Sequence, residues 1–110
     1  MGDAQVSLLA EAINRLWAKY LPQMEERVET LQNAAENLAN GTLTTKEQKL
    51  AGADAHKLAG VLGTFGLKEG TELAREAEGL YGSSLDADPA AASRLRVIAE
   101  ELRSMIANRN

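Results

Sequence analysis

Apolar residues recur at alternating spacings of four and three along this chain, and this period constrains the fold most strongly. The clearest run consists of Met24, Val28, Leu31, Ala35 and Leu38. An α-helix turns once every 3.6 residues, so this spacing places all five side chains on one helix face. No convincing stretch alternates polar and apolar residues as a half-buried strand does. The chain is therefore predicted to be all-α.

Proline and glycine divide the first part of the chain into two predicted helices. The first helix should cover about Ala4 to Tyr20 and end before Pro22, because proline disfavours the helical conformation of the preceding residue. Pro22 also suits the first turn of a second helix, which should end at Asn40-Gly41. The inner face of the first helix is predicted to consist of Leu9, Ile13, Leu16, Trp17 and Tyr20.

Capping patterns mark three further helices. The segment Thr44–Glu47 reads as a capping box that starts a helix ending at Gly66. The next helix should cover Lys68 to Tyr81, and Asp88-Pro89 should open the last one. Because the loops are short, we expect an antiparallel up-down four-helix bundle with an additional N-terminal helix. The inner faces of these three helices are predicted to consist of Ala51, Ala55, Leu58, Leu62 and Phe65, then Leu73, Ala77 and Leu80, then Ala91, Leu95, Ile98, Leu102 and Met105.

The size and composition of the chain limit the functions that it can have. With 110 residues the chain should form one domain over residues 4–110, and residues 1–3 are expected to be a cloning remnant or a disordered tail. The net charge of −4 argues against a nucleic-acid partner. The chain has no cysteine, no apolar run of membrane-spanning length and no signal-peptide pattern. A cytoplasmic protein without a membrane partner is therefore expected.

The single histidine of the chain, His56, is predicted to lie on a bare helix face. Helical geometry places it about 140° from the apolar stripe of its helix. Its neighbours one or two turns away are small, and they are Gly52, Ala53, Ala59, Gly60 and Gly63. The imidazole is therefore expected to be accessible to another protein.

The glycines in this helix need an explanation, because each weakens a helix interior by about 1 kcal/mol relative to alanine. Either a neighbouring helix of the bundle packs closely against them, or a partner protein approaches the backbone there. Burial would leave His56 in need of a buried hydrogen-bond partner, and the core stripe already occupies the opposite face. An exposed docking surface is the favoured interpretation.

Several kinds of site are excluded for His56 by what the chain lacks. A metal site needs more ligands than one histidine, and a haem would need an inward axial ligand. The serines lie in other segments, so a Ser-His-Asp triad has no support. The chain has no phosphate-binding GxxxxGK[ST] loop, which argues against self-phosphorylation from ATP. No cofactor is expected.

A nucleophilic role remains for His56. An exposed imidazole is largely neutral at pH 7, so one ring nitrogen has a free lone pair that can attack an electrophile brought by a partner. The small neighbours leave room for attack on phosphorus. Lys57 could attract a phosphoryl group electrostatically, although a merely solvated lysine is an equally good interpretation.

The run from Ala55 to Leu67, AHKLAGVLGTFGL, resembles the signature of histidine-containing phosphotransfer (Hpt) domains of multistep two-component phosphorelays. The segment from Glu69 to Glu78 is similar to the helix that follows in that family. Helix number and length agree over residues 4–110. One departure is Ala59, where many members of the family have a lysine.

The resemblance implies a phosphorelay carrier rather than an enzyme. His56 would accept a phosphoryl group from a phospho-aspartate of a receiver domain and pass it to another receiver aspartate. The receiver would supply Mg²⁺, and a hybrid histidine kinase could belong to the same chain. The alternative function is a non-catalytic helical binding module that docks a receiver or a partner helix with the same bare face.

Overall fold

The computed structural model describes residues 2–85 and 88–109, and within these residues it contains four α-helices and no strand. The helices are α1 (Gly2–Ala39), α2 (Thr45–Thr64), α3 (Lys68–Tyr81) and α4 (Pro89–Asn108). The chain is all-α, as its apolar spacing predicts. Helix α1 already includes Gly2 and Asp3, whereas Met1 lies outside the described residues.

Both ends of α2 and the start of α4 lie where the capping residues predict them. The side chain of Thr44 accepts a hydrogen bond from the backbone N–H of Glu47, and the Glu47 carboxylate accepts one from the N–H of Thr44. Gly66 has a φ of +74°, the left-handed conformation that closes the turn after α2. Asp88 caps α4, and Pro89 occupies its first turn. These contacts satisfy backbone groups that helix ends leave unpaired.

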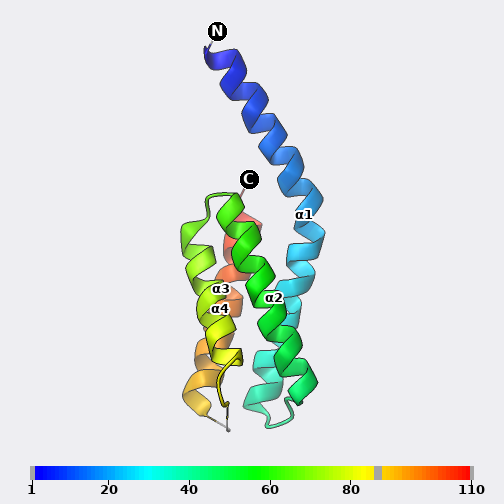
Figure 1. The fold of residues 1–110 in the computed structure, drawn as a ribbon, viewed down its shortest axis with the longest axis vertical. Coiled ribbons are helices and arrows are strands. Elements are labelled where there is room, and N and C mark those ends of the chain that lie inside the picture. Colours follow the sequence, from blue (N-terminus) through cyan, green and yellow to red (C-terminus); the bar gives the residue numbers. More distant parts are fainter. Residues whose placement is uncertain (1, 86–87, 110) are drawn as a thin grey trace.

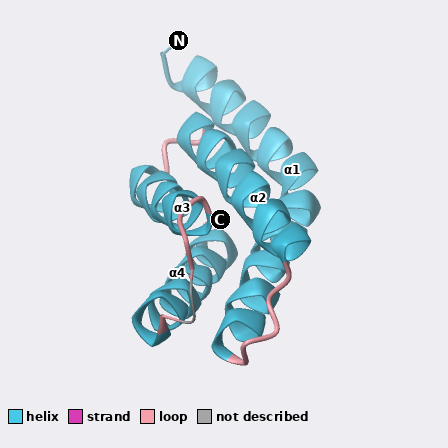
Figure 2. Ribbon diagram, turned by 60° about the horizontal axis from the view of Figure 1, so that its bottom comes forward, coloured by secondary structure: helices cyan, strands magenta, loops and turns pink. Residues whose placement is uncertain are grey.

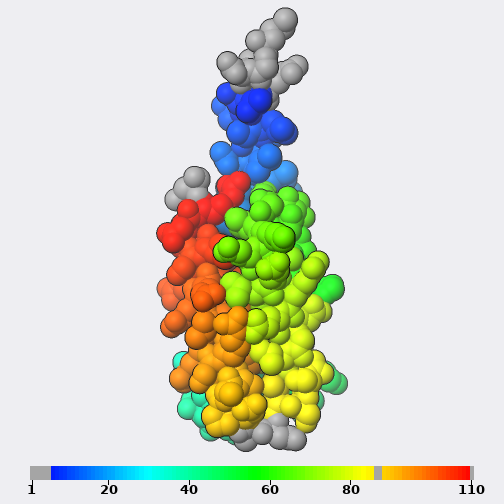
Figure 3. Space-filling view, turned by 90° about the vertical axis from the view of Figure 1, so that its left-hand side faces the viewer, coloured from blue at the N-terminus to red at the C-terminus, as the bar shows by residue number. Residues whose placement is uncertain are grey.

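The four helices run alternately in opposite directions and form one antiparallel bundle (Figure 1). Each helix packs against its neighbours in the chain, and α1 also packs against α4. Figure 2 shows that loops join the helices at the two ends of the bundle. On one side of the molecule α3 and α4 lie next to each other, and the first part of α1 extends beyond them (Figure 3). The up-down bundle is therefore confirmed.

The predicted break at Pro22 is wrong, because α1 is one helix of 38 residues that contains this proline. The additional N-terminal helix is thus the first part of α1 and no separate element. A proline inside a helix lacks an N–H, and its ring crowds the carbonyl four residues earlier, here that of Ala18. Bending of the helix relieves this crowding. Figure 1 shows the first part of α1 inclined to the second part.

The core consists mainly of leucine, isoleucine and alanine, and alanine lets the helices approach closely. Its largest fully buried side chains are Met24, Leu31, Leu58, Leu62, Leu95, Ile98 and Leu102. The predicted inner faces of α2 and of the second part of α1 are confirmed. On α3 Ala77 is buried as predicted, but Leu73 and Leu80 are only half-buried, and Ala74 and Tyr81 are buried instead. The predicted face of α4 is confirmed except at its end. There Ile106 is buried and Met105 is only half-buried, so the buried position in the last turns of α4 is one residue later than predicted.

The bundle ends at Trp17, and the first part of α1 extends beyond it. Phe65 contacts Trp17 edge-on, with 5.1 Å between the ring centroids, and the guanidinium of Arg109 lies 4.7 Å from the centre of the Trp17 ring. Because α2 and α4 end here, they offer no surface to the earlier residues of α1. The residues that were predicted to face the core but are exposed are Leu9, Ile13, Leu16 and Tyr20.

Candidate functional site

Helix α2 turns its apolar stripe into the core and presents His56 on another face. Ala55 and Leu58, which flank His56 in sequence, are fully buried. The side chain of His56 keeps 74% of its surface exposed. The prediction of an accessible imidazole is therefore confirmed.

The imidazole has a partner in Glu78 of α3. The carboxylate oxygen Oε2 of Glu78 lies 2.8 Å from Nδ1 of His56. An ionised carboxylate only accepts hydrogen bonds, so Nδ1 carries a proton and donates it. In the neutral ring Nε2 then has the free lone pair. This contact leaves Nε2 as the ring nitrogen that is open to a partner.

The turn between α2 and α3 determines which residue faces His56. His56 and Glu78 each lie eleven residues from Leu67, which is at this turn. Antiparallel helices with the same rise per residue bring such positions together. The hydroxyl of Thr71 fixes the alignment by donating to the backbone carbonyl of Ala59 at 3.1 Å. No local motif around His56 points to Glu78, but equal distances from Leu67 along the chain do.

Two of the residues predicted to form a bare docking surface are open to solvent. Gly60 and Ala53 are exposed, and a Cβ atom added at Gly60 would meet nothing within 4 Å. Gly60 therefore has room in front of its backbone, which suits the close approach of a partner.

The other three of these residues lie towards α3. Ala59 is 6% exposed, so the expectation that it belongs to an open surface is wrong, because α3 packs over it. Gly52 is half-buried and lies close to Tyr81, whereas Gly63 is exposed but lies close to Thr71. A Cβ atom added at Gly52 would lie 3.6 Å from Cβ of Tyr81, and one added at Gly63 would lie 3.3 Å from the hydroxyl oxygen of Thr71. Close helix packing thus favours glycine at position 63, whereas a Cβ atom at position 52 would make an ordinary van der Waals contact.

A hollow of about 420 Å³ lies beside His56, between α2 and α3. We call it the histidine hollow, and it is lined by His56, Ala59, Gly60, Arg75, Glu78 and Gly79. Arg75 is the residue with a positive charge among those that line it. Within the described residues the guanidinium of Arg75 makes no hydrogen bond or ion pair. No sequence motif marks this arginine as a candidate residue.

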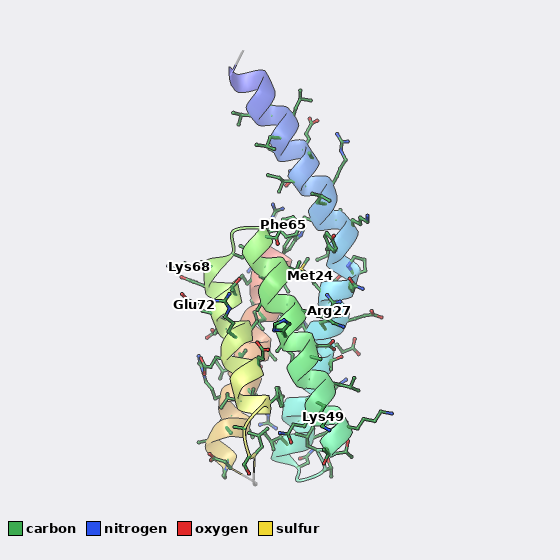
Figure 4. All side chains as sticks on the ribbon, in the orientation of Figure 1. Met24, Arg27, Lys49, Phe65, Lys68 and Glu72 are labelled. Atoms are coloured by element: carbon green, nitrogen blue, oxygen red, sulfur yellow. The ribbon has the colours of Figure 1, made fainter. Side chains whose placement is uncertain are left out.

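Lys57 lies on the other side of Gly60. It lines a second hollow of about 350 Å³ between α1 and α2, together with Arg27. We call this the apolar hollow, because Tyr20, Val61 and Phe65 supply much of its wall. Figure 4 labels Arg27 on α1 and Phe65 at the end of α2. The structure thus does not bring Lys57 into the histidine hollow.

Outside the two hollows, the described residues form neither a metal-binding group nor a membrane-spanning helix. Among the described residues, no group of three or more His, Cys, Asp or Glu side chains is placed to hold a metal ion. No helix within residues 2–85 and 88–109 combines the length and the apolar character needed to cross a membrane. A hollow of about 700 Å³ lies between α1 and α4, and its lining does not include His56.

A family model and a curated protein match this chain. The family model described as the Hpt domain matches residues 15–108. Among curated proteins, the chain is similar to protein RcaC of Microchaete diplosiphon, with 32% identity over 104 residues. This match covers 94% of the chain, which spans only 16% of the length of RcaC. No solved structure matches the chain significantly.

Proposed function

The chain belongs to the Hpt domain family, whose members carry phosphoryl groups in phosphorelays, and we propose that His56 is the residue that carries the phosphoryl group here. The donor would be a phospho-aspartate of a receiver domain, and the acceptor an aspartate of another receiver domain. The observation that carries this proposal is the exposed imidazole whose Nδ1 is held by Glu78.

The proposed transfer is one nucleophilic displacement at phosphorus. The lone pair of Nε2 forms a bond to the phosphorus atom while the bond between phosphorus and the aspartyl oxygen breaks. The bonding electrons leave with the aspartate, which becomes a free carboxylate. The proton on Nδ1 stays in place, so the ring becomes a phosphorylated cation. Glu78 stabilises that positive charge, and the reverse sequence passes the phosphoryl group to the next receiver.

The proposal also assigns separate roles to this chain and to the receiver domain. This chain would supply the nucleophile, and the receiver would supply the phosphoryl group and Mg²⁺. The domain would then be a phosphocarrier without an ATP site or a metal site of its own. A hybrid histidine kinase in the same chain and a cytoplasmic location stay predictions.

We propose that the receiver docks over Gly60. The apolar hollow next to Gly60 is lined by Tyr20, Val61 and Phe65, and it suits an apolar side chain or helix of the partner. Ala53 and Gly63 extend the exposed surface along α2. The half-buried Gly52 and the buried Ala59 are not part of this docking surface.

The test is transfer from a receiver domain. Receiver domains phosphorylated on aspartate are mixed with the chain, and phosphate that is labile in acid and stable in base is measured on it. We expect label on the wild-type chain and none on His56→Gln. Label that persists on His56→Gln would place the acceptor elsewhere.

The alternative, a binding module that carries no phosphate, makes a different prediction in the same experiment. It predicts binding of a receiver that is indifferent to His56→Ala, together with no label from any of a panel of phosphorylated receivers.

A further inference from the structure

We propose that Arg75 is a second functional residue of the site, and that its guanidinium binds the oxygens of the phosphoryl group on Nε2 of His56. This inference rests on His56 being phosphorylated, as proposed above. It adds the residue that balances the charge of the phosphoryl group.

The position of Arg75 follows from the same helix alignment that brings Glu78 to His56. Arg75 and Ala59 each lie eight residues from Leu67, so Arg75 faces α2 one helical turn from His56. The small residues Ala59 and Gly60 leave the histidine hollow open at this point. Arg75 and Glu78 are three residues apart on α3 and therefore share one face of that helix.

The charges in the histidine hollow show why a cation is needed. In phosphorylated His56 the ring is positive, and the carboxylate of Glu78 balances it at 2.8 Å from Nδ1. The phosphoryl group adds a negative charge of about 1.5 to 2 at neutral pH, as on other phosphorylated side chains. This charge has no counterpart among His56 and Glu78. A guanidinium suits it, because its planar N–H groups can donate to two phosphoryl oxygens at once.

The other cations near α2 and α3 are less suitable. Lys57 and Arg27 line the apolar hollow on the α1 side and do not line the histidine hollow. Arg94 is already bound to Glu76 by two hydrogen bonds of 2.5 and 2.7 Å. Arg75 is the only cationic side chain among the described residues that line the histidine hollow.

The experiment uses the whole chain phosphorylated chemically with phosphoramidate, a small phosphoryl donor for imidazoles. The pH titration of the phosphoryl group is followed by ³¹P NMR. A nearby guanidinium favours the dianion, so Arg75→Ala should raise the titration midpoint by about 0.5 pH unit. Arg75→Lys should restore part of the shift. Arg103→Ala, which removes an exposed arginine of α4 outside the histidine hollow, should leave the midpoint unchanged.

Transfer kinetics give a second readout. With a phosphorylated receiver as donor, Arg75→Ala should slow transfer to His56 by about three- to tenfold, and Arg103→Ala should not. The inference is overturned if Arg75→Ala behaves like Arg103→Ala in the ³¹P titration, or if Lys57→Ala produces the shift instead. Failure of phosphoramidate to label His56 would also count against it. Labelling by phosphoramidate but by no receiver would refute the proposed carrier function and leave the Arg75 result standing.

Discussion

Gly60 and Gly70 show how differently two glycines of neighbouring helices are used. A Cβ atom at Gly60 would meet nothing within 4 Å, whereas one at Gly70 would lie 2.8 Å from the sulfur of Met105 and 3.0 Å from Cδ1 of Leu62. Packing between α3 and its neighbours therefore leaves little room for a side chain at Gly70. Gly60 has such room, although it weakens α2.

Substitution at Gly60 should separate docking from stability. We expect Gly60→Ala to raise the free energy of unfolding by up to about 1 kcal/mol, because alanine favours a helix interior. Gly60→Leu should leave the bundle folded but weaken binding of the receiver, since its side chain would fill the docking surface. Urea unfolding and receiver titration measure the two effects. Gly70→Leu serves as the control that should destabilise the bundle, and unfolding of Gly60→Leu would show that Gly60 is needed for packing.

At the scale of helices, Pro22 makes α1 weaker than its length suggests. Proline in a helix interior costs about 3 kcal/mol relative to alanine. Pro22→Ala should therefore raise the free energy of unfolding by about 1–3 kcal/mol in urea titrations. Pro89→Ala is the matched control, because Pro89 lies in the first turn of α4, where proline is favourable. Equal effects of the two substitutions would contradict the idea that Pro22 strains α1.

The start of α2 should respond to acid through Glu47. The hydrogen bond from the backbone N–H of Thr44, with further help from the side chains of Thr44 and Asn37, holds the pKa of Glu47 below its ordinary value. A lowered pKa in the folded state stabilises the fold above the ordinary carboxyl range. This contribution is lost as the pH falls through the lowered pKa.

The prediction for Glu47→Gln is therefore a pH-dependent loss of stability. Wild type should exceed this variant in thermal midpoint near neutral pH, and the difference should shrink as the pH falls below the ordinary pKa of a glutamate, about 4.3, and through the lowered pKa of Glu47. Circular dichroism melts at several pH values provide the measurement. Glu100→Gln, at an exposed position of α4, is the control. A difference that stays constant with pH would refute the role of the Glu47 carboxylate.

At the scale of the whole molecule, the stability comes from one core, whereas the proposed phosphoryl transfer takes place on the exposed face of α2. Leu58 is fully buried two residues after His56, so Leu58→Ala should lower the free energy of unfolding by about 2–5 kcal/mol. Leu50→Ala on the exposed side of the same helix should change it little. Chemical denaturation measures both variants. Below its unfolding transition Leu58→Ala should still accept phosphate at His56, and loss of labelling in the folded state would contradict this separation.

Local signals explain what the sequence predicted and what it missed. The capping box at Thr44 and the glycine turn at Gly66 depend on neighbouring residues, so the ends of α2 could be predicted. Pro22 was misjudged because proline fits a first turn and a bent helix interior alike, and only the packing of α1 decides between them. Glu78 contacts His56 from another helix, and Arg75 lines the hollow beside His56 from that same helix. Their proposed roles therefore depend on the alignment of α2 with α3 and not on a local motif.

The most direct test of the account is NMR of the phosphorylated chain labelled with ¹⁵N-histidine. Because the chain has one histidine, every labelled signal belongs to His56. The account predicts phosphorus on Nε2 and a retained proton on Nδ1, with the proton signal weakened in Glu78→Ala. Phosphorus on Nδ1, or an unmodified imidazole in a phosphorylated chain, would contradict it.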